Sequence, residues 1–170
     1  VVVDVQRGGP STGLPTKTEQ SDLQQALYGR NGECPAVVMA ASSPSDCFHY
    51  AFEAGRIAME HMTPVILLSD GFIANGSEPW RIPQMKDYPA ICPPIVDEAP
   101  EGGFMPYVRN EKLARGWAFP GKVGLEHRVG GLEKDCVKGC ISIDPANHQK
   151  MTDTRAAKVA KAAEGKKDEK

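Results

Sequence analysis

The chain has 170 residues, of which 41% are hydrophobic, and its 20 basic and 22 acidic residues leave a net charge of -2. This length suits one domain with a hydrophobic core. The even charge balance and the lack of a basic stripe interleaved with aromatic residues predict no nucleic-acid partner. No apolar run approaches the roughly 18 residues of a membrane span, so no membrane partner is expected either.

The beginning of the chain and its cysteines predict a cytoplasmic location. The first residues lack the basic region and the cleavage site of a signal peptide. The five cysteines form no dense framework, which favours reduced thiols over disulfides. Because the sequence opens on three valines and not on methionine, we expect it to be a piece of a longer protein.

The first 75 residues contain three apolar runs, at 1–5, 36–41 and 64–68, with helical patterns between them. Runs of this kind are typical of parallel strands that are buried on both faces. The prediction is a βαβαβ unit, part of a doubly wound parallel sheet of the α/β class. Its loops, which begin at Arg7, Ser42 and Ser69, would share the edge of the sheet where such folds bind ligands.

The first helix of this unit is predicted from Glu19 to Tyr28. Thr18 is a candidate N-cap, because a threonine hydroxyl can accept a hydrogen bond from the first turn. Gly29 is expected just after the last turn, in the left-handed conformation that glycine adopts easily.

The second helix has a clearer start in "SPSD", where Ser43 can cap, Pro44 takes the first helical position and Asp46 lies in the first turn. Arg56 and Glu60 are expected on its outer side. The spacing of five further residues predicts the stripe that faces the sheet. These are Phe48, Phe52, Gly55, Met59 and Met62.

Beyond this unit the pattern changes. Prolines interrupt every periodic pattern over residues 76–143, which predicts an irregular Pro- and Gly-rich extension. Asp144 as cap and Pro145 at the first helical position start a linker helix within residues 144–170. Its thin apolar face would comprise Met151, Val159 and Ala163, and a charged, frayed tail would follow.

The stretch "QRGGPSTGLPT", residues 6–16, follows the first apolar run. Gly8 and Gly13 have the spacing of a Walker A loop, but Leu14 and Pro15 stand where that motif needs lysine and a hydroxyl residue. A dinucleotide-binding glycine pattern is also absent. The spacing therefore excludes both of these nucleotide motifs.

The chemistry of the stretch still suits an anion. Arg7 can present a bidentate fork that fits a carboxylate, and Gly8 and Gly9 let backbone N–H groups approach a ligand. The hydroxyls of Ser11, Thr12 and Thr16 add further donors. A structural alternative is equally compatible with these residues. In that alternative Arg7 pairs with an acid of a neighbouring chain and the glycines only form a turn.

Five segments resemble, in order and over nearly the whole chain, the α subunits of the 2-oxoacid:ferredoxin oxidoreductases, and among these the members that act on 2-oxoglutarate. The segments are "VVVDVQRGGPSTGLPTKTEQSDL", "MAASSPSDCF", "TPVILLSDGFIANGSEPW", "GLEHRVGGLEKD" and "ISIDPANHQKMTDTRAAKV".

The resemblance implies a part of the pyrimidine-binding domain of a thiamine-diphosphate enzyme. Such an enzyme decarboxylates 2-oxoglutarate, passes electrons to ferredoxin and forms succinyl-CoA from coenzyme A. It further implies that Arg7 and Thr16, and more weakly Thr12, bind the substrate, with Gly8, Gly9 and Asp70 at the edge of the pocket.

Several parts of the enzyme are expected outside this chain. The resemblance places thiamine diphosphate with Mg, and a [4Fe-4S] cluster, mostly or wholly on a partner β subunit. It implies no catalytic residue and no metal ligand here, so the chain alone is expected to be inactive. The alternatives are an α subunit for branched-chain or aryl 2-oxoacids and a non-catalytic subunit-docking domain.

Four residues are expected to have local structural roles, namely Cys136, Cys140, His127 and Asp70. Cys136 and Cys140 have a spacing that matches structural zinc sites poorly, so we expect loop thiols. His127 is expected to satisfy a turn. Asp70, besides its place at the pocket edge, is expected to cap the turn at Gly71.

Overall fold

A computed structural model describes residues 1–164. Within them the chain forms two compact units, residues 1–59 with 63–92, and residues 60–62 with the chain from 93 onward. The elements are β1 (Val2–Gln6), α1 (Ser21–Tyr28), β2 (Val37–Ala40), α2 (Pro44–His61), β3 (Val65–Asp70), α3 (Gly71–Asn75), a 3-10 helix (Met85–Asp87), β4 (Ile95–Val96), β5 (Trp117–Ala118) and α4 (Pro145–Glu164).

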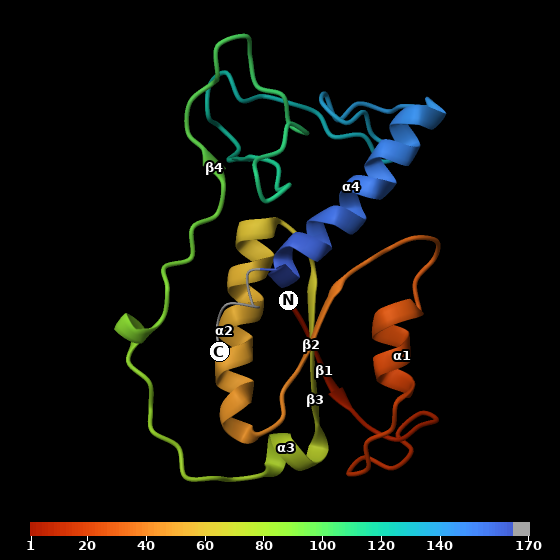
Figure 1. The fold of residues 1–170 in the computed structure, drawn as a ribbon, viewed down its shortest axis with the longest axis vertical. Helices are drawn as coiled ribbons and strands as arrows, with labels where there is room; N and C mark the ends of the chain where they lie inside the picture. Colours follow the sequence, from red (N-terminus) through yellow and green to blue (C-terminus); the bar gives the residue numbers. More distant parts are fainter. Residues whose placement is uncertain (165–170) are drawn as a thin grey trace. The chain divides into compact units, whose positions relative to one another are not determined.

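The first unit is built on a parallel sheet in the order β1-β3-β2. Val2 of β1 pairs with Ile66 of β3, and Val37 of β2 pairs with Val65. Figure 1 shows α1 and α2 on opposite sides of this sheet. This confirms the predicted α/β class and the partial doubly wound parallel sheet.

The burial of the strands differs from the prediction in one respect. The central strand β3 is buried, with Val65 at 0% and Leu68 at 1% exposure. The valines of β1 are exposed, for example Val3 at 59%. The expectation that every strand is buried on both faces is therefore wrong for β1, and it also fails for β2, whose residues are half-buried or exposed. Both are edge strands with one neighbouring strand each among the described residues.

Helix α1 begins later than predicted, at Ser21, after the N-cap residue Gln20. Thr18 therefore does not cap it. Gly29 ends the helix with φ -78°, so the left-handed conformation expected there is also wrong. A Cβ at this position would lie 2.6 Å from the carbonyl oxygen of Gln25, so close packing and not a positive φ favours glycine.

The predicted start of α2 is confirmed. The Asp46 N–H donates to Ser43 Oγ at 3.3 Å, and Pro44 is the first helical residue. The Asp46 carboxylate in turn accepts hydrogen bonds from the N–H and the hydroxyl of Ser42. These bonds lower the pKa of Asp46, chiefly through the Ser42 hydroxyl.

The buried face of α2 is not the predicted stripe. Cys47 lies 3.7 Å, Sγ to Oγ, from Ser69 of β3, and Ala54 and Ile57 on the same face are buried. Glu60, which was expected on the outer side, is only 4% exposed, and Lys112 binds its carboxylate at 2.7 Å.

The predicted stripe contacts aromatic residues that follow the sheet in sequence. The ring of Phe48 lies 5.3 Å from that of Trp80, and the ring of Phe52 lies 4.6 Å from that of Tyr88. Hydrophobic spacing identified a contact face, but the partner is the segment around residues 80–88 and not the sheet. A helix with apolar residues on two faces gives a spacing that does not show which of them meets the sheet.

The second unit is largely irregular, as predicted, with a short parallel pair in which Ile95 of β4 meets Trp117 of β5. Helix α4 begins as predicted, because the Asp144 carboxylate accepts from the N–H of Ala146 at 3.0 Å. Its buried residues are Asn147, Met151 and Ala162, so the expected face was right only at Met151. The predicted tail beyond residue 164 lies outside the described residues.

No helix among residues 1–164 is long and apolar enough to cross a lipid bilayer. By their contacts, residues 76–92 belong to the first unit. The expected three-part division at residues 75 and 143 stays a prediction.

Candidate functional site

The loop after β1 and the start of α3 lie at one edge of the sheet. Gln6 pairs with Asp70 at the ends of β1 and β3, so Arg7 and Gly71 both follow directly at the carboxyl ends of parallel strands. Figure 1 shows this loop and α3 at the same end of the first unit. Open α/β sheets bind ligands at this edge.

The loop closes on itself through its backbone. Gly8 donates its N–H to the carbonyl of Lys17, and the Leu14 N–H donates to the Gly8 carbonyl at 2.8 Å. Gly13 has φ +44°, and a Cβ there would lie 2.1 Å from the Gly8 carbonyl oxygen. Only glycine fits at position 13, so this part of the motif is a requirement of loop closure.

The N–H groups expected to face a ligand are already used inside the unit. Gly9 donates its N–H to the Glu19 carboxylate at 3.3 Å, and Arg7 donates its own to Asp22 at 3.2 Å. The hydroxyl of Ser21 and the N–H of Gly9 together lower the pKa of Glu19. An anion at this loop would therefore depend on side chains, and those of Arg7, Thr12 and Thr16 are exposed.

Both positive and negative side chains lie at the loop after β1. Asp22 lies near Arg7, and Asp4 on β1 has a raised pKa because burial and then the charge of Asp22 disfavour its ionised form. Asp4 and Asp22 oppose an anion at this edge, so any attraction for a carboxylate must come from the cations of the loop, Arg7 and Lys17, of which only Arg7 offers a bidentate fork.

Thr16 lies against the start of α3. A Cβ on Gly71 would meet the Pro15 carbonyl oxygen at 2.8 Å and the Cα of Thr16 at 3.6 Å. The absence of a side chain at Gly71 lets the end of the loop approach β3 and α3 this closely. Arg7 and Thr16, nine positions apart, are thereby held at the same edge of the sheet.

Asp70 is the N-cap of α3. Its carboxylate oxygen Oδ1 accepts hydrogen bonds from Phe72 at 2.9 Å and Ile73 at 2.8 Å. The predicted capping of the turn at Gly71 is confirmed. A role at the edge of a substrate pocket stays a prediction.

The loop thiols and His127 lie in the second unit. Cys136 and Cys140 are free thiols, and the Cys136 N–H donates to Asn147 Oδ1 at 2.9 Å. His127 Nδ1 lies 2.8 Å from the carbonyl oxygen of Leu125, two residues earlier, so this histidine does satisfy a turn. Residues 1–164 contain no group of three or more histidine, cysteine or acidic side chains that could hold a metal ion.

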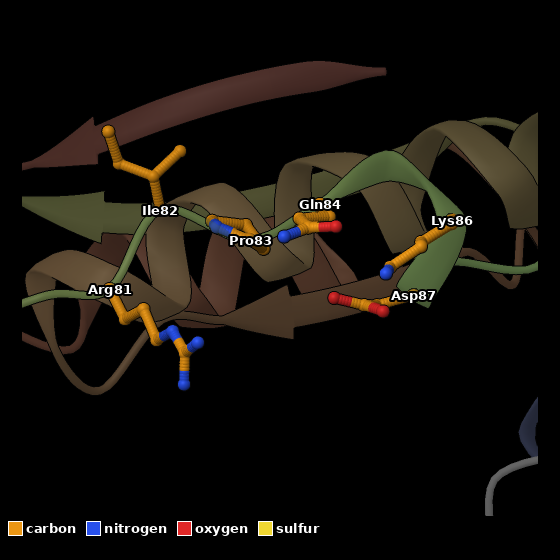
Figure 2. Close-up of a pocket in the computed structure, with 6 residues that line it drawn as sticks. All are labelled: Arg81, Ile82, Pro83, Gln84, Lys86 and Asp87. Carbon is orange, nitrogen blue, oxygen red and sulfur yellow. The ribbon is translucent and has the colours of Figure 1, made fainter.

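A groove of about 440 Å³ lies along residues 81–87 of the first unit. Figure 2 shows the ends of Lys86 and Asp87 close to one another, whereas Ile82 points the other way. None of the predicted site residues lines this groove, and one continuous stretch of chain forms it. It gives no reason to move the candidate site away from Arg7.

The second unit contains a group of basic residues that the sequence did not indicate as a site. Arg155 and Lys158 of α4 received no role from the sequence, yet they line a cavity together with Arg109 and Arg115. Their position relative to Met151 carried a signal, since residues three or four apart share a helix face and Met151 is buried.

Comparison with known proteins identifies the family. Residues 1–143 match the family model described as pyruvate flavodoxin/ferredoxin oxidoreductase, thiamine diP-binding. The chain is 60% identical over 160 residues to the 2-oxoglutarate oxidoreductase subunit KorA of Mycobacterium tuberculosis. This match covers 94% of this chain and 24% of that protein. It is 32% identical to the 2-oxoglutarate synthase subunit KorA of Methanothermobacter marburgensis over 94% of this chain and 41% of that protein.

A solved structure agrees with these sequence matches. The 2-oxoglutarate:ferredoxin oxidoreductase of Magnetococcus marinus, determined with 2-oxoglutarate, coenzyme A and succinyl-CoA bound, superimposes with a TM-score of 0.87 at 36% identity. The match covers 96% of this chain and 28% of that one. The chain thus spans well under half the length of these relatives. It belongs to the thiamine-diphosphate-binding family of the pyruvate flavodoxin/ferredoxin oxidoreductases.

Proposed function

We propose that this chain is the substrate-binding part of the α subunit of a 2-oxoglutarate:ferredoxin oxidoreductase. The reaction converts 2-oxoglutarate and coenzyme A to succinyl-CoA and CO₂, and two electrons pass to ferredoxin. The observation that carries the proposal is the loop after β1, which presents Arg7 and Thr16 at the ligand edge of the sheet. The printed names of the two relatives and of the solved structure support 2-oxoglutarate as the substrate.

Arg7 would bind a carboxylate of the substrate. Its guanidinium is a planar fork that matches a carboxylate. The hydrogen bond from Arg7 to Asp22 uses the backbone N–H, and the side chain is exposed. The hydroxyls of Thr12 and Thr16 would add neutral donors. A cation fixed in this way orients the 2-oxoacid, and if it meets the distal carboxylate it also selects dicarboxylic substrates.

Thiamine diphosphate belongs to this family's chemistry, and when bound it would supply the electron sink for decarboxylation of a 2-oxoacid. The described residues do not fit its metal ion, because they bring no three histidine, cysteine or acidic side chains together. We therefore place the Mg site on another part of the enzyme. What this chain supplies is a wall that holds and orients the 2-oxoacid.

The remaining components follow from the same proposal. A partner β subunit would hold most of the cofactor and a [4Fe-4S] cluster, and ferredoxin would accept the electrons. The exposed valines of β1 support a neighbour that covers this edge of the sheet. The five free thiols suit a cytoplasmic enzyme.

The proposal is tested by replacing Arg7 in the assembled enzyme. We expect Arg7→Ala to lower kcat/KM for 2-oxoglutarate about 10- to 100-fold, the effect of losing a hydrogen bond between charged groups. Arg7→Lys should restore only part of it, since an ammonium lacks the fork. Lys17→Ala, which removes a positive charge from the same loop, is the matched control and should leave kcat/KM near the wild-type value.

Two alternatives predict different results. If Arg7 only docks a partner chain, Arg7→Ala will weaken assembly, measured by sedimentation, while the assembled fraction keeps its turnover. If the enzyme acts on branched-chain 2-oxoacids, the wild type will turn over 2-oxoisovalerate faster than 2-oxoglutarate. Either outcome overturns the assignment of Arg7 to a carboxylate of 2-oxoglutarate.

A further inference from the structure

The second unit contains a cavity of about 310 Å³ with an unusual concentration of positive charge. Arg109 and Arg115 reach it from a tight turn, and Arg155 and Lys158 reach it from α4. Glu133 is the single acidic residue among the described residues that line it. All the residues that line this cavity belong to the second unit, and the proposed substrate loop belongs to the first.

The turn holds the two arginines side by side. Arg109 and Arg115 pair as an isolated antiparallel bridge, and the Asn110 carboxamide accepts the backbone N–H groups of Lys112 and Ala114, both at 3.0 Å. Both guanidinium groups lie over the ring of Tyr107, at 5.8 Å for Arg109 and 5.2 Å for Arg115. The backbone and the ring therefore fix two like charges next to each other.

Helix α4 adds two cations from one face. Arg155 and Lys158 are three positions apart, and Met151, one turn before Arg155, is buried and anchors this face. The Lys158 ammonium donates to the carbonyl of Met62 at 3.0 Å, and Arg155 donates to the Thr152 hydroxyl at 3.0 Å. Both contacts are with neutral oxygens, so neither cancels a positive charge.

The cavity's one carboxylate does not balance these cations. Glu133 lies 2.5 Å from His148 Nδ1 and 3.8 Å from Arg155 Nη1, so it is shared between two basic groups. Burial, and then the charges of Arg109 and Arg115, lower the pKa of Lys158 to about 8. Burial also lowers the pKa of Arg109. Like charges that are partly desolvated together destabilise a fold unless an opposite charge joins them.

We propose that this cavity binds a phosphate-type polyanion, a diphosphate or a phosphate ester, between the guanidinium groups of Arg109, Arg115 and Arg155 and the ammonium of Lys158. A single carboxylate carries too little charge to balance these groups, whereas a diphosphate carries several charges and many acceptor oxygens. Arginine forks suit phosphate oxygens in pairs. The volume exceeds that of one phosphate and leaves room for a second phosphate group or an ester substituent.

Direct binding tests the proposal without any turnover. The protein that carries this chain, purified with its subunits, is titrated with inorganic pyrophosphate by calorimetry. We expect saturable binding, at least tenfold weaker in Arg115→Gln and in Lys158→Gln. Lys150→Gln, an exposed position on the same helix, is the matched control and should bind like the wild type. Circular dichroism of each variant checks its fold, and pyrophosphate should raise the Tm of the wild type.

Coenzyme A distinguishes two sources of the phosphate groups. If coenzyme A displaces pyrophosphate, and Arg115→Gln weakens the binding of both compounds, the cavity holds the phosphate groups of the cosubstrate in the proposed function. If pyrophosphate binds equally well when coenzyme A is saturating, the ligand is a separate phosphate compound. The proposal is overturned if the wild type does not bind pyrophosphate, which is the result expected if a protein carboxylate occupies the cavity. It is also overturned if both Gln variants bind pyrophosphate as tightly as the wild type.

Discussion

At the scale of single residues, Asp70 shows how one side chain fits two hypotheses. Its carboxylate caps α3 through Phe72 and Ile73, and it also lies at the ligand edge of the sheet. The cap needs only an oxygen acceptor, whereas a role in the charge of the pocket needs the carboxylate. Substitutions can separate these two roles.

We expect Asp70→Ala to lower the free energy of unfolding by about 1 kcal/mol, the usual effect of losing an N-cap. Asp70→Asn should keep most of that stability, because its amide oxygen can accept the same bonds. Urea denaturation measures both. Equal destabilisation by Asp70→Ala and Asp70→Asn would contradict the capping account. A loss of turnover in Asp70→Asn without a loss of stability would indicate that the carboxylate has a role in the pocket.

Lys158 predicts a pH dependence of stability. Its pKa in the folded protein is about 8, below the ordinary 10.5. Below pH 8 the ammonium is therefore present in the folded and in the unfolded protein, and its full destabilising effect on the folded state is felt. As the pH rises through 8 the folded state loses this proton first, and stability should rise.

Urea unfolding at several pH values from about 7 to 9, on both sides of the pKa of Lys158, measures the effect. Glu133 does not interfere, because its contact with His148 lowers its pKa further from this range. Lys158→Met should abolish the rise. A rise of equal size in Lys158→Met would show that another group causes it.

At the scale of elements, the contact between the loop after β1 and the start of α3 links fold to site. Gly71 leaves room for Pro15 and thereby fixes where Thr16 lies. The geometry of the candidate site therefore depends on a residue that has no side chain of its own.

Gly71→Ala should raise KM for 2-oxoglutarate severalfold, because a Cβ would lie 2.8 Å from the Pro15 carbonyl oxygen and displace the loop. Gly55→Ala is the control, since its Cβ would meet nothing within 4 Å in α2. That variant should be as stable as the wild type or gain up to about 1 kcal/mol. Steady-state kinetics of the assembled enzyme decide, and an unchanged KM in Gly71→Ala would contradict the positioning role.

The sequence predicted the elements better than their surroundings. The cap of α2 and the parallel strands follow from local chemistry, and both were predicted correctly. Phe48 was assigned to the sheet, although its partner is Trp80, which comes much later in the chain. Spacing identifies a face that makes contacts but not what meets it. For the same reason Arg155 and Lys158 could not be assigned to a cavity, because the turn that supplies Arg109 and Arg115 has no periodic pattern.

At the scale of the whole molecule, the chain contains one wall of the proposed substrate site. It matches 24% to 41% of the length of two relatives. The described residues bring no metal-binding group together. The proposed activity would therefore be that of a longer protein, of which this chain covers a part.

We expect the isolated chain to form no succinyl-CoA when supplied with 2-oxoglutarate, coenzyme A, thiamine diphosphate, Mg and oxidised ferredoxin. Mass spectrometry of the acyl-CoA product measures this, with the assembled enzyme as the positive control. Product above the blank from the chain alone would show that it holds the whole cofactor site.

The self-contained bonding of the loop after β1 bears on how substrate preference can change. Gly8, Gly9 and Gly13 shape a main chain that closes through its own hydrogen bonds, so the scaffold does not depend on the guanidinium of Arg7. An apolar residue at this position would leave the backbone in place and remove the charge that suits a second carboxylate. Evolution could therefore exchange a dicarboxylic for a branched-chain substrate by altering side chains, while the scaffold stays the same.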